Sequence, residues 1–277
     1  MRPEFVIVGL IMVLMTSIML NINSVFGHNF KSDESAEFLA FVDKLKAELQ
    51  LVLANIQHND IDLAKKHGII ANDLYWLSFQ KEIAEKNKRI ATNLKDSLSV
   101  LQNSSFNTDS DIDEINSTIK DIKDILAESI SIRINPEHVN NSTIQMLRLT
   151  NLLNSIDNYY TKGVNTSTSN LRNDNYFYNN SEFINYKNLS QQNYTLAAIE
   201  DPAYYQSASE LAQYTEKLFD TELRIYLLND ETKIDYILDN LENLKNSINS
   251  KMIYGKIAHI ISSTQSMLNQ NFNLSLS

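Results

Sequence analysis

Turn-forming residues are scarce throughout this chain, with five glycines and three prolines in 277 residues. A β-sandwich or β-barrel of this length needs many tight turns, and these two residue types supply many of them. Apolar residues instead recur three or four residues apart, which is the spacing of one face of a helix. The stripe nearest the N-terminus consists of Phe38, Val42, Leu45, Leu49, Val52 and Ile56. The sequence therefore predicts an all-α protein.

Similar stripes along the chain predict about seven to eight amphipathic helices, arranged as one or more antiparallel helical bundles. The predicted helices cover residues 33–57, 60–77, 78–101, 111–126, 136–163, 202–228, 230–248 and 252–269. Asn135-Pro136 and Asp201-Pro202 each place a capping side chain before a proline, a pattern typical of a helix start.

Four segments follow from these patterns. Residues 1–27 form a signal peptide or membrane anchor, and residues 28–162 form an N-terminal helical bundle. Residues 163–201 are rich in Asn and Tyr and lack a helical period, which predicts a loop or linker. Residues 202–277 form C-terminal helices that pack on the bundle.

The N-terminal segment is the clearest indication of location. Residues 5–20 are uncharged and almost wholly apolar, they follow Arg2, and the uncharged run continues to Gly27. This pattern fits a cleaved signal peptide, and it is also long enough for a retained anchor through residues 5–26, because a spanning helix needs about 20 residues. Both alternatives place the bulk of the chain outside the cytoplasm, in a pseudo-periplasm, at the cell surface or anchored to the membrane.

Asparagine usage agrees with export. Nine Asn-x-Ser/Thr sequons occur, where the composition predicts about five by chance, and compositional bias remains the alternative explanation. The candidate N-glycosylation sites are Asn103, Asn116, Asn140, Asn141, Asn165, Asn179, Asn188, Asn193 and Asn273. Glycosylation requires these side chains to be exposed.

Charge and composition argue against several functions. The net charge is −10 and no basic stripe is present, so a nucleic-acid partner is not expected. The absence of cysteine excludes disulfides, thiolate metal sites and thiol catalysis. Glu-x-x-His, His-Glu-x-x-His, Gly-x-Ser-x-Gly and P-loop motifs are also absent, and no cofactor is indicated. We therefore expect a protein that is not an enzyme.

His67 is the one candidate metal ligand. It lies in an apolar stripe between Ala64 and Ala71, and Asn87 occupies a similar position in the next predicted helix. A buried, hydrogen-bonded histidine in a polar layer with Asn87 is the first interpretation. A metal site is the second, and it requires ligands from other helices because Asp60 and Asp62 lie too far from His67 on the same helix.

Three stretches of the chain carry a resemblance to a known group of proteins. They are EIAEKNKRIATNL (82–94), EINSTIKDIKDILAESISIRINPEHVNNSTIQML (114–147) and the closing LENLKNSINSKMIYGKIAHIISSTQSMLNQNFNL. Together with the order of leader, helices, loop and final helical pair, they resemble uncharacterised exported helical proteins of ammonia-oxidising archaea (Thaumarchaeota). The resemblance implies an archaeal envelope location and supplies no catalytic residues.

Two functions remain from the sequence. The first is a structural or protein-interaction module of the cell envelope, which binds an envelope or surface partner through helix faces or through the 163–201 loop. Tyr176, Tyr178, Tyr186 and Tyr194 of that loop are candidate contacts. The alternative is an extracytoplasmic protein that binds a small ligand or a metal.

Overall fold

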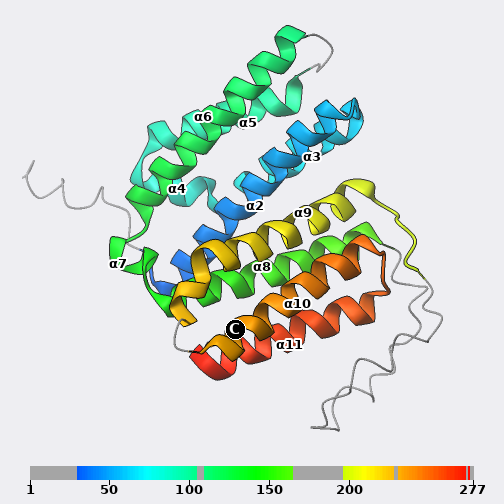
Figure 1. Ribbon diagram of the computed structural model, residues 1–277. Helices are drawn as coiled ribbons and strands as arrows, with labels where there is room; N and C mark the ends of the chain where they lie inside the picture. The colour runs from blue at the N-terminus through cyan, green and yellow to red at the C-terminus, as the bar shows by residue number, and fades with distance from the viewer. Residues whose placement is uncertain (1–29, 105–108, 165–195, 228–229, 273, 275–277) are drawn as a thin grey trace, which may run out of the picture.

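The computed structural model describes residues 30–104, 109–164, 196–227, 230–272 and 274. Every regular element within these ranges is a helix, which confirms the predicted all-α class (Figure 1). One isolated antiparallel bridge, between Val164 and Ile199, accompanies the helices. Residues 1–27, predicted to be a signal peptide or membrane anchor, lie outside the described residues. No helix within the described residues is both long and apolar enough to cross a bilayer.

The first bundle uses the chain up to residue 133. Its elements are α2 (Ser32–Gln57), α3 (Ile61–Leu74), the π-helix η2 (Tyr75–Phe79), α4 (Gln80–Lys86), α5 (Lys88–Asn103) and α6 (Asp109–Arg133). Their apolar stripes meet in one core, and all six residues of the stripe predicted for α2 are buried. Gly68 lies at a close approach of α3 to α5, because a Cβ there would lie 3.1 Å from the carbonyl oxygen of Leu101.

The second bundle uses the rest of the chain. Its elements are α7 (Pro136–Val139), α8 (Ser142–Gly163), α9 (Pro202–Leu218), the π-helix η4 (Phe219–Leu223), the 3₁₀-helix η5 (Arg224–Leu227), α10 (Glu231–Asn249) and α11 (Tyr254–Phe272). The buried faces of α8, α9, α10 and α11 form a second core. Most buried residues of α8 thus pack with the C-terminal helices, although the predicted segments grouped this helix with residues 28–162.

Helices α2 and α8 join the two bundles. They run side by side in the same direction, since Ser35 contacts His138 near their starts and Asp43 contacts Arg148 further along. Ala40 and Ala47 of α2 pack into the second core. In Figure 1, α2 and α8 lie between the outer helices of the two bundles. Any site between the bundles is therefore built around α2.

Two helices that the sequence predicts as continuous are interrupted, so these two predictions are wrong. The predicted helix 78–101 breaks at Asn87, which has an extended backbone and accepts a hydrogen bond from the Ile90 amide as the N-cap of α5. The predicted helix 136–163 breaks after Asn140, and Asn141 caps α8 through the Ile144 amide. In both cases an asparagine side chain replaces a helical backbone hydrogen bond.

The ends of the predicted 163–201 loop are held together. Val164 pairs with Ile199, and the Glu200 amide donates to the Gly163 carbonyl over 2.9 Å. The Ala197 amide donates to the Lys251 carbonyl over 2.7 Å. The four loop tyrosines of the prediction lie outside the described residues.

Candidate functional site around helix α2

His67 is fully buried between three helices. Its Nδ1 lies 2.7 Å from Oε2 of Glu48 on α2, and its Nε2 lies 2.8 Å from Oε1 of Gln206 on α9. Gln206 also exchanges hydrogen bonds with Asn55 of α2. The cluster Glu48–His67–Gln206–Asn55 therefore fixes the position of α9 against α2 and α3.

The hydrogen bonds of this cluster determine where its protons lie. The Leu51 carbonyl can only accept, so the Asn55 atom 2.8 Å from it is the amide nitrogen. The same nitrogen donates to Gln206, which makes Oε1 the atom that faces His67. Because Oε1 can only accept, Nε2 of His67 carries a proton. The contact with Glu48 then holds a second proton, which makes the Glu48–His67 unit neutral overall.

This environment counts against the predicted metal role of His67. Both ring nitrogens already make hydrogen bonds, so neither offers a lone pair to a metal. The described residues also contain no group of three His, Cys, Asp or Glu side chains that could hold an ion. The predicted polar layer of His67 and Asn87 is not made by these hydrogen bonds. The Asn87 side chain caps α5 instead. Asp60 caps α3 by accepting a hydrogen bond from the Leu63 amide.

A second buried cluster lies further toward the start of α2. Asp43 accepts two hydrogen bonds from the guanidinium of Arg148, over 2.5 Å from Nε and 2.8 Å from Nη2. The Tyr214 hydroxyl of α9 donates to the same carboxylate over 2.7 Å, and Gln145 accepts from Nη1 of Arg148. Burial is the largest single effect and opposes the charge of Arg148, but the attraction and hydrogen bonding of Asp43, together with Tyr214 and Glu222, outweigh it and raise the pKa of Arg148. The bidentate pair and the hydroxyl satisfy charges that would otherwise be costly to bury.

A polar stripe on α9 faces both clusters. It consists of Gln206, Glu210 and Tyr214, four residues apart and thus on one face of the helix. Burial raises the pKa of Glu210, and the nearby charge of Glu48 adds to this effect. Burial raises the pKa of Tyr214, and the nearby charge of Asp43 adds to this effect. The polar residues of this stripe on α9 thus lie next to polar residues of α2 along the junction of the bundles.

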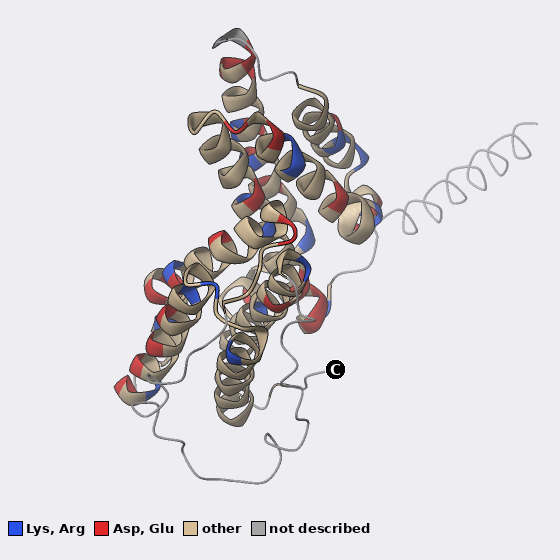
Figure 2. Cartoon of the chain, turned by 90° about the vertical axis from the view of Figure 1, so that its right-hand side faces the viewer, with Lys and Arg blue, Asp and Glu red and all other residues tan. Residues whose placement is uncertain are grey.

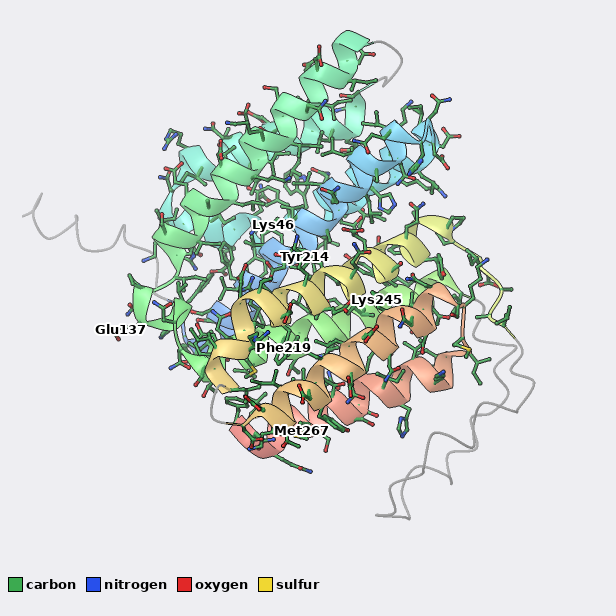
Figure 3. All side chains as sticks on the ribbon, viewed as in Figure 1. Lys46, Glu137, Tyr214, Phe219, Lys245 and Met267 are labelled. Atoms are coloured by element: carbon green, nitrogen blue, oxygen red, sulfur yellow. The ribbon has the colours of Figure 1, made fainter. Side chains whose placement is uncertain are left out.

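Two clefts open on the sides of α2. The cleft of about 610 Å³ lies against α9, and we refer to it as the Lys46 cleft. Lys46 and Tyr214 of its lining are labelled in Figure 3, where they lie at the junction of the two bundles. The cleft of about 540 Å³ lies against η2 and α8, and we refer to it as the Lys44 cleft. Both volumes fall within the range of about 300–1,000 Å³ that small-molecule sites occupy.

Each cleft borders a π-helix. Thr221 and Glu222 of η4 line the Lys46 cleft, while Ser78 and Phe79 of η2 line the Lys44 cleft. Single π-helical turns inside α-helices are frequent at functional sites. The clefts, and not the buried polar clusters, are therefore the first candidates for a ligand site.

The described sequon asparagines are all exposed. Asn103 lies at the end of α5, Asn116 on the outer face of α6, and Asn140 and Asn141 in the turn before α8. The remaining five, Asn165, Asn179, Asn188, Asn193 and Asn273, lie outside the described residues. Glycosylation of these sites stays a prediction.

An exposed apolar surface lies on α3 and η2. Ile69, Trp76 and Leu77 are 40%, 43% and 86% exposed. Ile69 and Trp76 are seven residues apart, which is two helical turns and therefore nearly one face. Nζ of Lys95 lies 5.3 Å from the centre of the Trp76 ring. We call these three residues the Trp76 surface.

The sequence did not single out Asp43, Glu48 or Arg148. The available signal was the position of charged residues directly beside the apolar stripes, as Asp43 is beside Val42 and Glu48 beside Leu49. On a helix with one exposed face such neighbours point to solvent, but α2 is covered on nearly all sides. Figure 2 shows basic residues scattered among acidic ones on the described helices.

Comparison with known proteins gives no family for this chain. No protein-family model matches it, and no curated protein or solved structure matches it either.

Proposed function

We propose that this protein is an exported interaction module of the archaeal cell envelope, held at the membrane by residues 5–26 and without a reaction of its own. The apolar N-terminal run, the excess of sequons and the resemblance to exported archaeal proteins support its location. The observation that carries the proposal is the position of the Trp76 surface beside the point where the N-terminal segment joins the fold.

That junction is an aromatic cluster. Phe30, the first described residue, is buried against Phe38 and Phe79, with ring centres 5.5 and 6.5 Å away. The guanidinium of Arg133 lies over the Phe30 ring, 3.8 Å from its centre. Glu82 in turn pairs with Arg133 over 2.8 Å. These contacts fix the chain to the bundle immediately after the apolar segment.

The Trp76 surface is close to this junction. Phe79 follows Leu77 by two residues within η2 and packs on Phe30. The uncharged run ends at Gly27, and three residues of chain span at most about 10 Å. An anchor through residues 5–26 therefore keeps Trp76 and Leu77 next to the bilayer. Trp and Lys side chains with apolar stems are suited to the membrane–water interface.

Tethering at this end leaves the opposite end free for an envelope partner. The parallel helices α2 and α8 begin near the tether, and α8 ends on the far side, where Val164 and Ile199 meet (Figure 1). The described ends of the 163–201 segment thus lie away from the bilayer. It is the first candidate for the partner contact.

The single tryptophan provides a direct test. The full chain is reconstituted in vesicles that contain lipids brominated near the head group. We expect these lipids to quench Trp76, and we expect Trp76 to be protected from acrylamide in the water. The control carries Trp76→Phe and Leu196→Trp, which moves the probe to an exposed position beside the Lys251 contact in the second bundle. If acrylamide quenches both proteins equally and brominated lipid quenches neither, the proposed orientation is wrong.

A further inference from the structure

Lys44 has an unusual position on α2. It lies between two buried residues, Asp43 and Leu45, and its side chain lines the Lys44 cleft. Its ammonium group makes no hydrogen bond and no ion pair with the described part of the chain. Burial lowers the pKa of Lys44, and the charge of Glu37 only partly opposes this shift. A partly buried ammonium without a close partner is costly, so an anionic group at this position would be bound favourably.

The cleft offers a second charge at a defined distance. Glu37 precedes Lys44 by seven residues, so the two share a face of α2 with their Cα atoms about 10.5 Å apart along the helix. Ala40, the residue between them on this face, also lines the cleft, although most of its surface is buried against the second core. Glu37 is exposed to the cleft and makes no ion pair within the described residues.

The other acids of the cleft already have partners. Oε2 of Glu34 accepts from the Lys31 amide at the start of α2, and Glu82 pairs with Arg133. Glu37 is therefore the carboxylate available to a ligand. Asn151 and Ser155 of α8 add neutral hydrogen-bonding groups to the lining, and Phe79 adds an apolar surface.

We propose that the Lys44 cleft binds a small zwitterion, with its carboxylate on Lys44 and its ammonium group on Glu37. Free amino acids and short peptides are the ligands of this class. Three carboxylates line the cleft against one lysine, which disfavours phosphates and other multiply charged anions. The inference is independent of the membrane tether, because none of its contacts involves the Trp76 surface or residues 5–26.

Calorimetric titration of the purified full chain tests the proposal. The probes are glycylglycine and L-leucine, with acetate and methylammonium as ligands that carry only one of the two charges. We expect saturable binding of the zwitterions and weaker binding of both single charges. Lys44→Met should weaken zwitterion binding about tenfold or more, as expected for the loss of a charge-assisted contact. Glu37→Gln should weaken zwitterion binding but should not weaken acetate binding.

The matched control is Lys46→Met, which removes a lysine two residues away that lines the other cleft. It should bind the probes as the unmodified chain does. The proposal is overturned if neither zwitterion gives saturable heat at millimolar concentration. It is also overturned if Lys44→Met binds as tightly as Lys46→Met.

A second measurement uses the unmodified chain, so it does not depend on whether a variant folds. Acetylation of lysine amines with a water-soluble reagent is followed by mass spectrometry, with and without glycylglycine. The amine of the probe also consumes reagent, so the rate at Lys44 is divided by the rate at Lys46 in the same sample. The probe should lower this ratio. An unchanged ratio, at concentrations that saturate the heat of binding, would place the ligand elsewhere.

Discussion

Glu48 of α2 and His67 of α3 form a neutral pair in the interior, with Oε2 and Nδ1 2.7 Å apart and side chains 1% and 0% exposed. The pair is the centre of the contact among α2, α3 and α9. Its proton arrangement follows from one backbone group, the Leu51 carbonyl, through Asn55 and Gln206. The position of the His67 proton therefore depends on the orientation of the Asn55 and Gln206 amides.

Nε2 of His67 should carry a proton at neutral pH and should exchange it slowly with solvent. Nitrogen–proton correlation spectra of the histidine rings measure this, and His67→Gln identifies the signal. Asn55→Leu removes the donor that orients Gln206, so the amide can rotate and the Nε2 proton should no longer be fixed. An Nε2 without a proton in the unmodified chain would contradict the proposed hydrogen-bond directions.

Arg148→Met should destabilise the protein strongly. It leaves the Asp43 carboxylate buried without its cation, and such losses cost about 3–5 kcal/mol. Urea unfolding measures the change in the free energy of unfolding. Tyr214→Phe, which removes one hydrogen bond to Asp43, should cost about 1 kcal/mol.

The control for Arg148 is Arg224→Met. Arg224 pairs with Asp220 on the surface, where both side chains are about half exposed, so its loss should cost less than about 0.5 kcal/mol. Equal effects of the two arginine variants would show that the Asp43–Arg148 pair is not part of a closed core.

Glu210 should make stability depend on pH. Burial raises its pKa above the ordinary value of 4.5, so in the window between these two pKa values the folded state binds more protons than the unfolded state. The free energy of unfolding therefore falls as the pH rises through this window. Glu210→Gln removes this loss, and the variant should match the unmodified chain below pH 4.5 and gain relative stability above it.

Thermal unfolding across this pH range provides the measurement for Glu210. Glu242→Gln, on the exposed face of α10, is the control and should not reproduce the pH-dependent gain. A constant difference between Glu210→Gln and the unmodified chain at every pH would mean that the substitution acts through packing alone.

Two glycines should respond to alanine in opposite directions. A Cβ at Gly163 would lie 2.5 Å from the backbone nitrogen of Tyr205, so Gly163→Ala forces α8 and α9 apart and should cost about 1–3 kcal/mol. A Cβ at Gly255 meets nothing within 4 Å, and Gly255→Ala should stabilise α11 by about 0.4–1 kcal/mol. Chemical denaturation distinguishes the two signs, and a neutral Gly163→Ala would refute the close approach of these helices.

Some of these features could be predicted from the sequence because they are local. Scarce turn residues and apolar stripes give the all-α class, and the cap-proline pairs give the starts of α7 and α9. The breaks at Asn87 and Asn140 could not be placed, because asparagine at a stripe position fits both a helix interior and a cap.

The polar clusters could not be predicted because they are not local. Gln206 meets His67 across 139 residues, and Asp43 meets Arg148 across 105. No spacing pattern on one helix indicates such a pair. The place of His67 in an apolar stripe predicts that its side chain is buried, and the structure confirms this. Its partners depend on how α9 packs on α2.

Export is the central claim, and the lack of native cysteine allows a direct measurement. Asp121→Cys places one thiol on the exposed face of α6. Intact cells that produce this variant are treated with a maleimide that cannot cross membranes, and a second sample is treated after lysis. We predict full labelling of the chain in intact cells. Labelling that occurs only after lysis would contradict the proposed location and the function that depends on it.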